Sequence, residues 1–163
     1  MSRAFGRYKP DRSISMNNSN NSADIDVLNG LIQTTQDSVE GYRDAAEDAT
    51  RGETFRQMAQ ERAEVVDALQ GSVRQMGGEP ETDGSALASA HRSFMGLKDA
   101  ITGTSDEAIY SEVERGEEHL KEKYEDALSN DDISPQARQV VQQCYDSVQK
   151  GYQRARQLSA QTS

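Results

Sequence analysis

The residues best suited to chemistry lie in one acidic segment, Glu112–Leu128, with the sequence EVERGEEHLKEKYEDAL. The segment contains six glutamates, one histidine and one tyrosine. Carboxylates beside an imidazole can bind a transition metal inside a helical bundle, but the same side chains also form the solvated face of an ordinary charged helix. Whether this segment is a metal site or a solvated helix face depends on the helices that position it.

Composition restricts the class of protein. The 163 residues are enough for one domain with one core, and 34% of them are hydrophobic. The net charge of −10 disfavours nucleic acid, whose phosphates require clustered Lys and Arg. Cys144 is the only cysteine, so no internal disulfide can form. No run approaches the ~18 apolar residues of a membrane span, and we expect a cytoplasmic protein without membrane or nucleic-acid partners.

Apolar residues recur at steps of three and four along most of the chain, which predicts an all-α fold. We expect helices over about 24–50, 55–76, Asp106–Leu128 and from Pro135 onward. Short turns join the first pair and the second pair, but about 25 residues separate the pairs. A short fifth helix is expected there, over Ser85–Ile101. This order predicts a ferritin-like four-helix bundle with one long crossover.

The N-terminal segment, residues 1–23, is predicted to be a disordered tail, with basic residues first and a run of Asn and Ser after them. The bundle is expected to occupy residues 24–163, with Ser22 capping its first helix. Met1 and Met16 are alternative translation starts.

A di-iron centre in such a bundle requires a Glu on each of two helices and Glu-x-x-His on the other two. Neither histidine fits, because the residue three positions earlier is Ala88 for His91 and Gly116 for His119. We therefore expect no catalytic residues and no resident cofactor. The alternative is a looser transition-metal site, whose weak candidate ligands are Glu61, Glu64, Glu117 and His119.

Arg62 occupies a core position in the second helix. A buried guanidinium needs a carboxylate, because an unpaired buried charge is very costly. Glu117, Glu61 and Tyr124 are within reach at a similar depth. We therefore predict a polar core layer built on Arg62, Glu117 and Tyr124, with the stripe Val113, Gly116 and Leu120 facing inward beside Glu117.

Several runs of sequence resemble a bacterial family of ferritin-like four-helix-bundle proteins catalogued as a domain of unknown function. The resemblance covers about residues 24–160, and its runs are DVLNGLIQTTQDSVEGYRDAAED, GGEPETDGSALASAHRSFMGLKDAITG, EVERGEEHLKEKYEDAL and ISPQARQVV. It implies a soluble bacterial protein with this fold and no established activity. It also adds His91 and Arg92 to the expected polar layer.

Three functions follow as hypotheses. The first is a non-enzymatic binding or stress-associated structural protein, a homo-oligomer with a dimer favoured; the association with stress comes from analogy with the fold. The second is a metal-binding bundle that stores or oxidises iron, manganese or zinc. The third is a helical adaptor with an exposed apolar groove.

Overall fold

The computed structural model describes the backbone of residues 12–84 and 105–162, and the side chains of residues 21–84 and 105–161. These residues form four helices and no strand, as the all-α prediction requires. The helices are α1 (Arg12–Asp48), α2 (Gly52–Gln75), α4 (Asp106–Leu128) and α5 (Pro135–Thr162).

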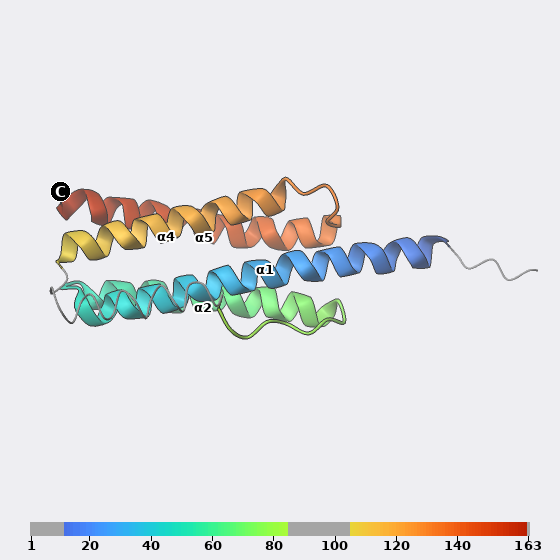
Figure 1. Ribbon diagram of the computed structural model, residues 1–163, viewed down its shortest axis with the longest axis horizontal. Helices are drawn as coiled ribbons and strands as arrows, with labels where there is room; N and C mark the ends of the chain where they lie inside the picture. The colour runs from blue at the N-terminus through green and yellow to red at the C-terminus, as the bar shows by residue number, and fades with distance from the viewer. Residues whose placement is uncertain (1–11, 85–104, 163) are drawn as a thin grey trace, which may run out of the picture.

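The helices are arranged as two antiparallel hairpins, α1–α2 and α4–α5 (Figure 1). Helix α1 also packs on α4, and α2 packs on α5. Because α2 and α4 run in the same direction, the chain between them has to return along the bundle. Its described start follows the first hairpin: Asn29 Nδ2 donates to Glu79 O over 3.0 Å and Asn29 Oδ1 accepts from Glu81 N over 2.9 Å. The fifth helix expected over Ser85–Ile101 lies outside the described residues.

Helix α1 begins earlier than the sequence indicated. The backbone is helical from Arg12, so Ser22 lies inside the helix instead of capping it. Asn and Ser are weak helix formers, but here they extend a helix that is already packed. Asn21 Nδ2 donates to the carbonyl of Met76 over 2.7 Å, which ties this part of α1 to the end of α2.

Helix α2 stops where two glycines follow it, as predicted. Gly77 has a φ of 81°, a conformation that favours glycine. Gly77 N donates to Arg74 O and Gly78 N donates to Val73 O, both over 3.0 Å. These two bonds satisfy carbonyls that the helix end would otherwise leave unpaired.

Helix α5 starts on a cap that α1 holds in place. Ser134 Oγ accepts from Ala137 N over 3.1 Å, the bond expected of an N-cap serine. Asp24 of α1 is buried, and its carboxylate accepts from Ser134 N over 2.8 Å and from Ser134 Oγ over 2.6 Å. Asp24 therefore stabilises the start of α5, a role that the sequence did not suggest.

The core consists of two hydrophobic clusters, one toward each end of the bundle. Residues such as Leu28, Leu69 and Leu120 belong to the first cluster, and Phe55 and Tyr110 belong to the second. On each helix, the boundary between the two clusters lies at the level of Arg62 and Glu117. These two are the positions from which the site is built.

Candidate functional site

The centre of the site is a buried ion pair between α2 and α4. Arg62 Nη2 donates to Glu117 Oε2. Only 3% of the Arg62 side chain and 2% of the Glu117 side chain are exposed, so solvent hardly screens the two charges. Burial alone would lower the pKa of Arg62, but Glu117 and Tyr42 raise it above its ordinary value, and the guanidinium stays charged.

Glu117, not Gly116, is the inward residue at this turn of α4. Gly116 is exposed, a Cβ added to it would meet no atom within 4 Å, and the sequence prediction of an inward Gly116 is wrong. Glu117 lies between the inward side chains Ile109 and Leu120 along the helix and is as buried as they are.

The Glu117 carboxylate is fully engaged by the protein. While Oε2 accepts from Arg62, Oε1 accepts from Ser38 Oγ of α1 over 2.7 Å. Sequence reasoning missed Ser38, whose signal was a polar side chain one position before the inward Val39. A carboxylate with both oxygens occupied is poorly placed to act as a general base or a metal ligand without breaking these bonds.

Tyr124 lies beside the ion pair but pairs elsewhere. Its hydroxyl shares a hydrogen bond of 2.8 Å with Thr35 Oγ1 of α1. Thr35 Oγ1 also donates to Leu31 O over 2.6 Å, which makes the hydroxyl of Tyr124 the donor in the shared bond. Burial raises the pKa of Tyr124 above its ordinary value, so this hydroxyl is protonated.

The other side of Arg62 faces Tyr42 of α1. The guanidinium carbon lies 5.8 Å from the centroid of the Tyr42 ring. Among the described residues, Arg62 Nε, Arg62 Nη1 and the Tyr42 hydroxyl have no hydrogen-bond partner. Burial, and then the charge of Glu117, raise the pKa of Tyr42 far above its ordinary value, so its hydroxyl is a donor as well.

A glycine of α5 leaves the room that the ion pair occupies. A Cβ on Gly151 would collide with Arg62 Nη2 and lie 3.0 Å from Glu117 Oε2. The sequence alone offers no reason for a glycine at this position of α5. The close approach to Arg62 supplies that reason.

The other predicted site residues are not brought together. Glu61, Glu64 and His119 are exposed, whereas Glu117 is buried. Glu61 accepts from Gln57 over 3.2 Å. No group of three or more His, Cys, Asp or Glu suited to a metal occurs within residues 12–84 and 105–162. His91 and Arg92, expected in the polar layer, lie outside the described residues.

Cys144 is a buried core residue, as predicted. Burial raises the pKa of its thiol to about 11. A thiol with this pKa carries very little thiolate near neutral pH, so Cys144 is unsuited to nucleophilic or redox chemistry.

The reactivity of Cys144 gives a direct test. Relative to an ordinary thiol pKa of 9.0, a pKa of about 11 lowers the thiolate fraction at pH 8 about 100-fold. We expect labelling by an aromatic disulfide to be at least about 100-fold slower in the native protein than in denaturant, and the native rate to rise with pH up to about pH 11. A native rate within tenfold of the denatured rate, on the order of an exposed thiol, would contradict this burial.

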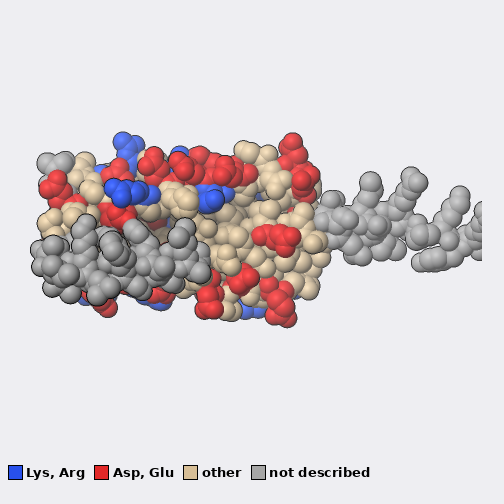
Figure 2. All heavy atoms as spheres, viewed as in Figure 1, with Lys and Arg blue, Asp and Glu red and all other residues tan. Residues whose placement is uncertain are grey.

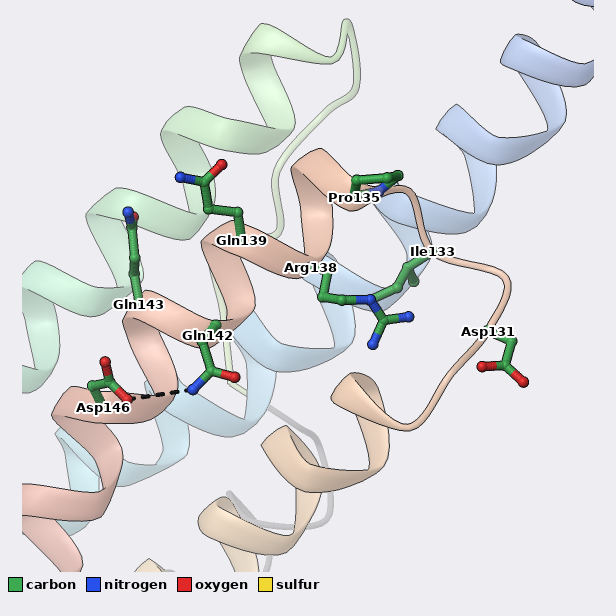
Figure 3. Close-up of a pocket in the computed structure, with 8 residues that line it drawn as sticks. All are labelled: Asp131, Ile133, Pro135, Arg138, Gln139, Gln142, Gln143 and Asp146. Atoms are coloured by element: carbon green, nitrogen blue, oxygen red, sulfur yellow. Dashed lines mark hydrogen bonds between the residues drawn. The ribbon is translucent and has the colours of Figure 1, made fainter.

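The surface of the described residues is marked by its charge and by one hollow. Acidic side chains of α4 lie along the upper edge of the molecule in Figure 2. A hollow at the start of α5 is lined by Gln139, Gln142 and Gln143 and by Arg138 (Figure 3). Arg138 donates to the carbonyls of Leu128 and Asn130, so this cation closes the α4–α5 loop.

Residues 23–130 match the family described as a domain of unknown function, DUF2383. The chain belongs to this family. The DUF2383 match includes both Arg62 and Glu117 and ends before α5, whereas the resemblance was expected to reach about residue 160. No curated protein matches this DUF2383 chain. In the part of the chain that the structure describes, no helix combines the length and the apolar character needed to cross a bilayer.

Proposed function

We propose that this chain is a non-enzymatic, ferritin-like bundle protein that acts by binding, with an internal ion pair at the level where related bundles would hold metal. The single observation that carries the proposal is the engagement of Glu117 by Arg62 and Ser38. A bundle that binds two metals directs several carboxylates and imidazoles inward. Here one inward carboxylate is neutralised by an inward arginine.

The ferritin-like part of the proposal is supported by the connectivity. Two antiparallel hairpins are joined so that the second and third long helices run in the same direction. A simple up-down bundle joined by short loops would make them antiparallel. Fold alone does not imply function, so the functional part of the proposal depends on the chemistry at Arg62 and Glu117.

The charge of Arg62 beside Glu117 explains why we rank metal binding as the second candidate function. A divalent ion at Glu117 would lie next to the guanidinium of Arg62, and that repulsion would act at low dielectric. Glu61 and Glu64 are exposed, and within the described residues neither forms with Glu117 a group of three or more side chains suited to a metal.

Metal analysis of the purified protein tests the proposal. The protein is prepared without chelator, incubated with Fe²⁺, Mn²⁺ or Zn²⁺, desalted and analysed for bound metal. We expect far less than one metal per chain, both in wild type and in Glu117→Gln. The matched control is Glu118→Gln, since Glu118 is the next residue on α4 and is exposed.

A different pattern would favour the metal-binding alternative. Stoichiometric metal that is retained in Glu118→Gln and lost in Glu117→Gln would overturn the non-enzymatic proposal. Circular dichroism on both variants establishes that any loss of metal is not a loss of fold.

We place self-association first among binding roles. Many core side chains are small, including Ala45, Ala46, Ala59 and Ala137, so the core is thin and a dimer that buried further apolar surface would add stability. The acidic surface over α4 disfavours nucleic acid as the partner. Sedimentation equilibrium is expected to give a dimer, and a monomer throughout the micromolar range would count against this role.

A further inference from the structure

A small void lies beside the buried ion pair, between α1, α2 and α5. Its volume is about 10 Å³, and it is lined by Tyr42, Met58, Glu61, Arg62, Ser147 and Gly151. The volume is at the lower limit for one water molecule, roughly 10–15 Å³.

Unpaired donors border this void. Tyr42 and Arg62 line it, and their hydroxyl, Nε and Nη1 groups have no hydrogen-bond partner among the described residues. Both side chains are more than nine-tenths buried. A buried polar group without a partner is costly, so an acceptor in the void would be stabilised by these donors.

The charges around the void select the kind of occupant. The buried positive charge of Arg62 disfavours a cation in the void. An anion is disfavoured too, because Glu117 already neutralises Arg62 and Glu61 lines the same void. A neutral molecule that both accepts and donates suits the lining, since Ser147 and Glu61 are also lining residues and both side chains contain oxygen acceptors.

We propose that this void is a binding site for one water molecule, which accepts from Arg62 and joins it to the Tyr42 hydroxyl. Water meets the limits of size, charge and hydrogen bonding together. The molecule extends the polar layer from α4 and α2 to α5, where Ser147 lies one turn before Gly151.

Crystallography in the presence of sodium bromide tests the occupant. We expect a density peak within hydrogen-bond distance of Tyr42 Oη and of an Arg62 nitrogen, without anomalous signal from bromide. A void without density would overturn the proposal. An anomalous peak at this position would overturn it as well, by making the site one for an anion.

The sign of a stability change tests the same site in solution. If water joins Tyr42 to Arg62, Tyr42→Phe removes a satisfied hydroxyl and should lower Tm by about 2–4 °C. If the void is dry, the same change removes an unpaired buried hydroxyl and should leave Tm unchanged or raise it. The latter result would overturn the proposal.

Tyr124→Phe is the matched reference. Its hydroxyl bonds Thr35 directly, so this variant should lower Tm whether or not the void holds water. A fall in both variants supports the water site, and a fall in Tyr124→Phe alone rejects it.

Discussion

Replacing Arg62 by methionine is expected to lower the free energy of unfolding by about 3–5 kcal/mol. The change leaves Glu117 buried without its cation, and only Ser38 remains to bond its carboxylate. Methionine keeps much of the length of the arginine side chain. The lost stability therefore reflects the missing charge more than a new cavity. Urea unfolding followed by circular dichroism measures the difference.

Arg56→Met on the same helix is the control for Arg62→Met. Arg56 pairs with Glu53 over 2.8 Å, but 61% of its side chain is exposed, and exposed pairs contribute little. We expect this variant to unfold almost as the wild type does. An equally small effect of Arg62→Met would show that the buried pair has been misassigned.

The combined variant Arg62→Met with Glu117→Leu should recover most of the lost stability. Removing both charges leaves no buried unpaired ion, and an apolar pair of similar volume is often as stable as the ion pair it replaces. The two changes are therefore expected to be strongly non-additive. Additive losses would mean that the two side chains do not interact.

Gly151→Ala is expected to destabilise the protein by about 1–3 kcal/mol, although alanine is the better helix former. The added methyl would overlap the position of Arg62 Nη2 and press on Glu117 Oε2, so the ion pair has to shift. The unfolding free energy of the variant, measured in urea, gives the effect.

Gly116→Ala on α4, the other helix of the same hairpin, is the matched change. A methyl on Gly116 meets no atom within 4 Å, so only helix propensity should act, and stability should rise by roughly 0.5–1 kcal/mol. If Gly151→Ala lowers the free energy of unfolding and Gly116→Ala raises it, the loss at Gly151 is due to steric conflict and not to helix propensity. If Gly151→Ala also stabilised the protein, the close packing of Arg62 on α5 would be refuted.

Much of the fold could be predicted because the chain repeats its apolar residues with a helical period. The ends of α2 and α4 and the start of α5 agree with Gly77, Leu128 and the Ser134-Pro135 pair. The start of α1 could not be read, because Asn and Ser suggest a loop and the bond from Asn21 to Met76 is visible only in three dimensions.

The site was harder to predict than the fold. Arg62 at a core position indicated a buried carboxylate, but Gly116 was assigned the inward position because a step of three from Val113 fits a seven-residue stripe. On a helix of 3.6 residues per turn, Glu117 lies about 40° from the line through Val113, and Gly116 about 60° on its other side. Glu117 is therefore nearer the axis of the bundle.

The contacts that surround the Arg62–Glu117 ion pair had weaker signals in the sequence. Thr35 and Tyr42 are buried, but sequence spacing within one helix says nothing about which side chain of another helix they meet. Tyr124 accordingly bonds Thr35 rather than Arg62. The glycine at position 151 becomes informative only when the distance from α5 to α2 is known.

The bond between Asp24 and Ser134 has a consequence for how the protein unfolds. The first turn of α5 depends on a carboxylate contributed by α1, more than a hundred residues earlier in the chain. A fragment containing only the second hairpin would lack that carboxylate, and the N-terminal amides of its last helix should exchange with solvent quickly. The two halves are thus expected to melt in a single cooperative step, because separating them undoes the anchor of a helix as well as the contact between them.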